Sequence, residues 1–114
     1  MWIRVVDLED LKATPLTKFD INDVSIVCGM IDKKPFAFDS ACPHKEGPLE
    51  KGELVGDRIR CPWHGYEFNI FTGKVALIPY PPKYGEWRKT GNLRVHRTKI
   101  SKNALYAEFR KPAR

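Results

Sequence analysis

Two short segments of the chain contain residue types that bind soft and borderline metal ions. Residues 42–44 (Cys-Pro-His) form the first arm, and residues 61–64 (Cys-Pro-Trp-His) form the second arm after sixteen intervening residues. Each arm supplies one thiol and one imidazole, and donors of these types converging from separate loops are typical of a metal site. We therefore predict a metal centre held by four ligands, Cys42, His44, Cys61 and His64.

The mixed composition of each arm bears on the kind of metal. A structural zinc site also uses two Cys and two His, but the common zinc-finger spacing groups the two Cys in one arm and the two His in the other. An arm with one donor of each type can reach both metals of a dinuclear cluster. An iron–sulfur cluster is therefore favoured, and a single zinc ion is the alternative. Unrelated buried cysteines and surface histidines would not explain this spacing.

The third cysteine, Cys28, lies in the apolar segment 24–30, which is typical of a strand. We expect it to be a small buried hydrophobic residue rather than a redox thiol. If two of the three cysteines bind metal, no intramolecular disulfide is possible without the loss of a ligand. This cysteine usage fits a reducing compartment.

The length of 114 residues allows one domain with a modest core. No apolar run approaches the roughly 18 residues of a membrane span, and early acidic residues argue against a signal peptide. We expect a soluble, cytoplasmic monomer without a membrane anchor.

The net charge of +6 is unevenly distributed. Residues 83–114 contain ten Lys or Arg and two acidic residues, whereas residues 1–82 have a slight acidic excess. The basic end is either a solvated surface or a docking surface for an acidic protein partner. Nucleic-acid binding is disfavoured, because few aromatic residues that could stack on bases accompany the basic ones.

Short apolar segments separated by turn residues predict a small all-β domain. No helix longer than a turn or two is expected, and the proline-rich segment 76–82 is unsuited to a central strand. The expected strands cover residues 2–6, 16–21, 24–30, 36–38, 52–55, 58–60, 66–70, 93–97 and 104–109.

The two arms resemble the signature of Rieske-type [2Fe–2S] ferredoxins, in particular the soluble low-potential type associated with oxygenases. Gly65 after the second arm and the Gly-Pro-Leu of residues 47–49 belong to the same signature. The strand pair that runs into residues 36–39 and the segment 68–74 also resemble the family, so the resemblance covers nearly the whole chain. It implies that one iron is bound by Cys42 and Cys61. The other iron, near the surface, would be bound by His44 and His64.

The resemblance also implies a fold. The family has an antiparallel β-sandwich or barrel base, here residues 1–39 and 81–114, and a small β insert, here about 40–80, that binds the cluster. The whole of 1–114 is then one Rieske domain. The segment 81–92 is longer than the usual connection in the family, and it is either an inert surface loop or a contact for a partner.

Departures from the respiratory members of the family change two expectations. Those members brace the arms with a disulfide, and the matching positions here are Gly47 and Trp63. The arms must then be held by packing, for which Trp63, Pro48 and Leu49 are the candidates.

We also expect a partner to dock at the tip through apolar contacts around Trp63 and Leu49.

Respiratory members also place a Ser and a Tyr hydroxyl near the cluster sulfurs, where this chain has Tyr66 and Phe68. Loss of these donors predicts a low reduction potential, because hydrogen bonds to sulfur stabilise the added electron.

The resemblance implies a one-electron carrier between a reductase and an oxygenase or another redox enzyme. The alternative is a small iron–sulfur subunit of a larger oxidoreductase complex. We do not expect an enzyme, because no second set of metal ligands and no paired carboxylates suggest a reaction of its own.

Overall fold

The computed structural model describes residues 1–11, 16–21 and 23–109, and within these ranges the strands form three antiparallel sheets. The first sheet has the order β1 (Trp2–Asp7), β10 (Ala104–Glu108) and β9 (Thr98–Ser101). The second has the order β2 (Thr17–Ile21), β3 (Val24–Ile31) and β4 (Lys34–Asp39). The third has the order β5 (Glu53–Val55), β6 (Arg58–Arg60), β7 (Glu67–Asn69) and β8 (Val75–Leu77). The prediction of an all-β antiparallel fold is confirmed.

Helical structure is limited to single turns. They are α1 (Leu8–Leu11) and the 3-10 turns η1 (Leu49–Lys51), η2 (Pro82–Tyr84) and η3 (Glu86–Arg88). In the described part of the chain, no helix is long and apolar enough to cross a bilayer.

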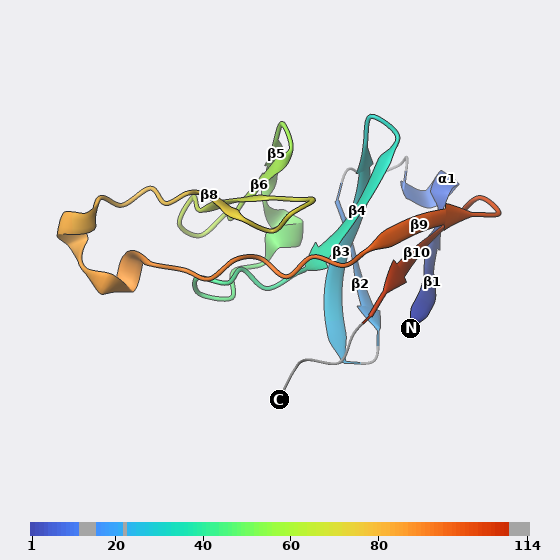
Figure 1. The fold of residues 1–114 in the computed structure, drawn as a ribbon, viewed down its shortest axis with the longest axis horizontal. Coiled ribbons are helices and arrows are strands. Elements are labelled where there is room, and N and C mark those ends of the chain that lie inside the picture. The colour runs from blue at the N-terminus through green and yellow to red at the C-terminus, as the bar shows by residue number, and fades with distance from the viewer. Residues whose placement is uncertain (12–15, 22, 110–114) are drawn as a thin grey trace.

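The molecule is elongated, with extents of 51 × 33 × 19 Å. Figure 1 shows the first two sheets at the end that contains the N-terminus, with the third sheet beside them. The chain after β8 extends to the opposite end, where η2 and η3 lie, and then returns to β9.

The second sheet separates two apolar cores, because successive side chains of a strand point to opposite faces. On β3, Ile26 and Cys28 face the first sheet, where they pack with Leu105 and Ala107 of β10. The intervening Val27 belongs to the other core. That second core also contains Phe36, Phe38, Leu49, Ile59, Phe68 and both arm cysteines. The two candidate thiol ligands are thus anchored in packed structure.

The prediction of a strand at residues 93–97 is wrong, because the strand lies further along the chain. The regular strand is β9, and residues 93–97 are extended chain with one bridge, between Val95 and Phe38. The reason is the two-residue turn at Lys102 and Asn103, which both have positive φ. This turn pairs Ser101 with Ala104, so the partners of β10 are residues 98–101.

The extended chain at 93–97 still has a structural role. The backbone N–H of Asp39 donates to the Arg94 carbonyl at 3.0 Å, and that of His96 donates to the Ala37 carbonyl at 2.9 Å. The His96 ring also contacts the Asp39 carboxylate at 2.7 Å. These bonds fix the end of β4, from which the first arm begins. The division into a base and an insert, with limits near 40 and 80, stays a prediction.

Candidate metal centre

The two arms have the same backbone turn. In the first, the Cys42 N–H donates to the Gly47 carbonyl at 2.9 Å, and the Glu46 N–H donates to the Cys42 carbonyl at 2.7 Å. In the second, the Cys61 N–H donates to the Tyr66 carbonyl at 2.8 Å, and the Gly65 N–H donates to the Cys61 carbonyl at 3.0 Å. The fifth residue of each turn has positive φ, 59° at Glu46 and 78° at Gly65.

Each arm is also closed by a cross-strand pair at its base. Ala41 pairs with Pro48 below the first arm, and Arg60 pairs with Glu67 below the second. Both arms are therefore hairpin loops of the same length, residues 42–47 and 61–66. A repeated loop of this kind presents its cysteine at the same place in each copy.

The two arm cysteines lie together in the core. Cys42 and Cys61 are 2% and 3% exposed, and their side chains are within hydrogen-bonding reach of each other. The pKa of Cys42 is raised to about 12, mainly by burial and also by the neighbouring Cys61, while the His44 backbone N–H that bonds its sulfur acts in the opposite direction. A buried pair of thiols becomes a pair of thiolates when a metal ion supplies the compensating positive charge.

The two arm histidines lie together as well, but their surroundings differ. The ring centroids of His44 and His64 are 5.5 Å apart. His44 is 7% exposed, whereas His64 is an exposed residue. The resemblance places the iron of these two imidazoles near the surface; of the two rings, that of His64 is at the surface and that of His44 is buried.

The four donors are arranged as a thiol pair and an imidazole pair. Within the described residues, no group of three or more His, Cys, Asp or Glu side chains is placed to hold a single metal ion. A [2Fe–2S] centre of mixed ligation uses two separate pairs, because one iron takes two thiolates and the other takes two imidazoles. The donor chemistry of the two pairs fits that group.

Gly47 allows the two arms to approach each other. A Cβ atom at this position would lie 2.8 Å from the Cys61 Sγ and 3.2 Å from the Trp63 ring. The expectation that packing involves Trp63 is confirmed by this contact, although Trp63 remains 58% exposed. Leu49 is fully buried in the core, so it braces the first arm. The expectation that a partner would touch Leu49 is therefore wrong.

An ion-pair network supports the base of the second arm. The Glu67 side chain is 3% exposed and lies between two arginines, with Arg60 Nε at 3.0 Å and Arg58 Nη1 at 3.2 Å. Arg60 also reaches Glu53 at 3.3 Å. The network joins β5, β6 and β7, and it fixes the hairpin from which the second arm projects.

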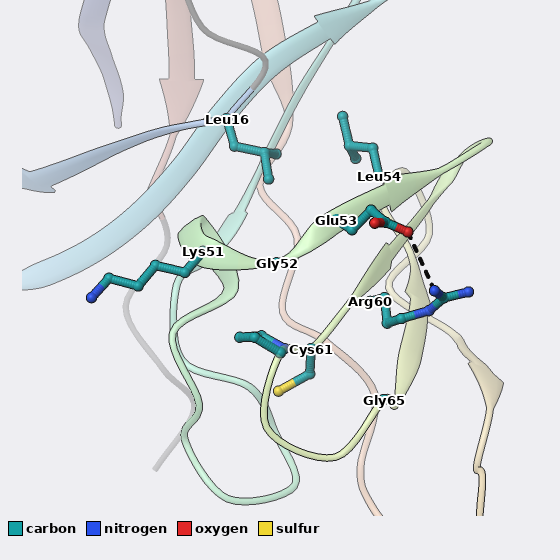
Figure 2. Close-up of a pocket in the computed structure, with 9 residues that line it drawn as sticks. Leu16, Lys51, Gly52, Glu53, Leu54, Arg60, Cys61 and Gly65 are labelled. Atoms are coloured by element: carbon teal, nitrogen blue, oxygen red, sulfur yellow. Dashed lines mark hydrogen bonds and ion pairs between the residues drawn. The ribbon is translucent and has the colours of Figure 1, made fainter.

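An open groove of about 730 Å³ lies beside the second arm. Figure 2 shows the ion pair of Arg60 and Glu53 on one of its walls and Leu16 and Leu54 on another. Cys61 and Gly65 also line the groove, so the second arm is open to solvent on this side as well as around His64.

The positions that match the sulfur-bonding hydroxyls of respiratory proteins are both fully buried. Phe68 has no hydroxyl to offer. The Tyr66 hydroxyl donates to the Arg88 carbonyl at 2.5 Å and lies 3.1 Å from His44 Nε2. Burial is the main cause that raises the pKa of Tyr66, which keeps the phenol protonated as a donor at neutral pH.

Sequence reasoning did not find the contact between the first arm and residues 82–88. The Trp87 carbonyl lies 2.9 Å from His44 Nε2, across 43 residues of chain. This contact is made by backbone, so no residue type in the sequence signals it. The unusual length of the segment 81–92 was the available hint.

The fold and the centre together define a small antiparallel β domain with a mixed thiol and imidazole site on two hairpin arms. The model of the Rieske [2Fe–2S] domain family matches residues 1–99. The chain belongs to this family, and its cofactor is a [2Fe–2S] cluster.

Two relatives and one solved structure show how far the similarity extends. Human apoptosis-inducing factor 3 is 38% identical over 77 residues, which is 68% of this chain but only 11% of the human protein's length. The ferredoxin component of a naphthalene 1,2-dioxygenase system from Pseudomonas putida is 27% identical over 95 residues, 82% of this chain and 91% of that protein.

The solved structure is a complex of reduced oxygenase and oxidised ferredoxin in carbazole 1,9a-dioxygenase. One of its chains superposes with a TM-score of 0.80 at 24% identity, over 99% of this chain and 97% of that chain. At this identity the likeness supports the fold.

Proposed function

We propose that this chain is a one-electron carrier whose [2Fe–2S] cluster is held by Cys42, His44, Cys61 and His64. The observation that carries the proposal is the separation of the four donors into a buried thiol pair and an imidazole pair with one exposed member. Bound there, the cluster would supply reversible one-electron chemistry. The chain would supply the ligands, bury both thiols and present one imidazole at the surface.

The proposed partners are redox proteins, a reductase that delivers the electron and an oxygenase or other redox enzyme that accepts it. The support is the Pseudomonas relative, which is named a ferredoxin component and which this chain nearly spans. The alternative, a small subunit of a larger complex, is not favoured, since that relative is named a ferredoxin component. We further propose that the chain has no catalytic activity of its own. A monomeric state and a cytoplasmic location stay predictions from the sequence.

We also propose that the reduction potential is low. Phe68 cannot donate to sulfur, and the single proton of the Tyr66 hydroxyl is directed at the Arg88 carbonyl. Without these donors the potential should lie below zero, in the lower part of the roughly −150 to +300 mV range of Rieske centres. A potentiometric titration should therefore follow a one-electron curve with a negative midpoint. A midpoint well above zero would contradict this part of the proposal.

The test of the function is an electron paramagnetic resonance spectrum of the dithionite-reduced protein, together with iron and zinc analysis. We expect two irons per chain and a rhombic signal with the low average g value of mixed nitrogen and sulfur ligation. A silent sample with one zinc per chain would reject the electron carrier in favour of a zinc-stabilised binding module.

A further inference from the structure

The two imidazoles of the centre differ in what surrounds their outer nitrogen. His44 Nε2 lies 2.9 Å from the Trp87 carbonyl oxygen and 3.1 Å from the Tyr66 hydroxyl oxygen. His64 is exposed, and its nearest ring neighbours are His44 and Tyr80, with a centroid distance of 6.5 Å to Tyr80. The first arm is therefore enclosed where the second is open.

The contacts of His44 determine which of its nitrogens has the proton. A carbonyl oxygen only accepts hydrogen bonds, so the Nε2 that faces the Trp87 carbonyl must be an N–H. The Tyr66 hydroxyl has already donated its proton to the Arg88 carbonyl, so it too accepts from His44. The lone pair of this imidazole is then on Nδ1, and the ring is held in the tautomer that can bind a metal there.

Ring packing holds His44 in this orientation. The Tyr66 ring stacks on the His44 ring at a centroid distance of 4.0 Å and an interplanar angle of 15°. Tyr80 joins the same cluster, 6.1 Å from Tyr66 and 5.0 Å from Trp87 between ring centroids. The outer surface of this cluster is formed by Tyr84 and Trp87, which are 51% and 48% exposed.

We propose that Tyr66 and residues 82–88 form a cover that positions His44 and closes it to solvent, so that His64 is the imidazole through which the cluster meets a redox partner. Tyr66 acts here as a positioning residue, since it acts through His44. The inference rests on the proposed function, because it assigns different roles to the two histidines of that centre. A partner would then approach the second arm, where Pro62, Trp63 and His64 are exposed.

The first test maps the accessibility of each histidine in the iron-loaded protein with diethyl pyrocarbonate, which acylates an accessible imidazole nitrogen. Mass spectrometry of the peptides separates the three histidines of the chain. We expect His64 to react at least about tenfold faster than His44, because reaction at His44 requires local opening of the cover. Equal rates at the two residues, or faster reaction at His44, would overturn the proposal.

Two variants open the cover and one serves as the control. Tyr66→Phe removes the hydroxyl but keeps the stacked ring, and Gly85→Ala places a Cβ at φ 103° between η2 and η3. Both should increase the reaction of His44 and leave that of His64 unchanged. Gly91→Ala lies in the same segment with nothing within 4 Å, and it should match the wild type. Unchanged protection of His44 in both cover variants would show that the cover does not act as proposed.

The second test measures electron self-exchange between oxidised and reduced copies by nuclear magnetic resonance line broadening. Self-exchange has no driving force, so a change of potential caused by the modification does not affect the comparison. Protein acylated at His64 alone should exchange electrons at least about tenfold more slowly. The reason is that the acyl group on each copy keeps the clusters of the two copies further apart when they meet. Unchanged exchange would contradict the role of His64.

Iron content is measured on every sample before these tests, which keeps the two proposals distinguishable. If the wild type binds zinc and no iron, the electron carrier is rejected and the assignment of His64 as the electron-transfer imidazole falls with it. If the cluster is present and the two histidines react alike, the function stands and the cover is rejected.

Discussion

The two arms of the centre share a backbone and differ in their environment. Both are hairpin loops with the same two internal hydrogen bonds and the same positive φ at the fifth residue. The first arm lies under the segment 82–88, which contacts His44. The second arm projects from a charged hairpin base and presents His64 to solvent.

This difference shows how one loop design can supply two kinds of ligand. The repeated turn places Cys42 and Cys61 side by side in the same apolar core. The histidines follow their cysteines by two and three residues, so they leave the turns differently. Position within the turn and the 82–88 cover together make one imidazole internal and the other external.

The largest effect should come from removal of either thiol. Cys42→Ser and Cys61→Ser should each abolish cluster binding, because the two buried thiols act as one pair and a hydroxyl is a poor ligand for this iron. Iron per chain and the reduced-state resonance signal measure the loss. Cys28→Ala is the matched control, because Cys28 is equally buried but packs in the other core. A Cys61→Ser protein that keeps two irons would show that the thiol of the second arm is not needed for cluster binding.

The approach of the arms can be disturbed at Gly47. Gly47→Ala introduces a Cβ 2.8 Å from the Cys61 Sγ, so the arms must separate, and we expect a cost of about 1–3 kcal/mol in folding stability. Iron loading should fall as well. Denaturant unfolding of the iron-loaded protein measures the first quantity, with Gly91→Ala as a substitution in open space. A Gly47→Ala protein as stable as the Gly91→Ala protein would mean that the arms have room to move apart.

The charged base distinguishes the second arm from the first. Glu67→Gln removes the carboxylate that Arg58 and Arg60 share, and the partial exposure of both arginines limits the expected cost to about 1–2 kcal/mol. Glu53→Gln affects an exposed pair of the same network and should cost less than about 0.5 kcal/mol. Thermal unfolding of the two variants compares them directly. If both lose the same stability, the buried carboxylate has no special role.

The fifth residue of each turn offers a comparison in which the two arms should respond in opposite directions. Glu46 holds a left-handed conformation that Gly65 holds without strain in the other arm. Glu46→Gly should therefore stabilise the protein by about 0.5 kcal/mol, since relief of the strain exceeds the added entropy of the unfolded chain. Gly65→Ala should have the opposite sign and cost about 1–2 kcal/mol. Denaturant unfolding measures the change in the free energy of unfolding for each variant. If both substitutions stabilise the protein, or both destabilise it, the two turns are not equivalent.

The shared features of the arms were accessible from the sequence, because they depend on residue type. Thiols and imidazoles at fixed spacing identified the four candidate ligands, and short apolar segments between turn residues identified the all-β fold. The position of β9 was also within reach, since a two-residue turn at 102–103 dictates the pairing of Ser101 with Ala104. Residues 93–97 alternate apolar and polar side chains, which is also typical of a strand, so the side-chain pattern alone does not separate them from residues 98–101.

The difference between the arms was not accessible in the same way. The burial of His44 depends on the carbonyl of Trp87, and every residue type offers a carbonyl. The burial of Leu49 depends on the core that the second and third sheets form around it, whereas in the sequence it is an apolar residue next to a predicted exposed tip. Long-range backbone contacts and packing of this kind leave no local pattern.

The central claim is that the arms hold two irons in unequal sites, one with two thiolates and the other with two imidazoles. A Mössbauer spectrum of the oxidised protein loaded with iron-57 tests it most directly. The account predicts two quadrupole doublets of equal area, one for each iron. A single doublet would mean that the two irons have the same ligands, and it would contradict the assignment of Cys42, Cys61, His44 and His64 as two separate pairs.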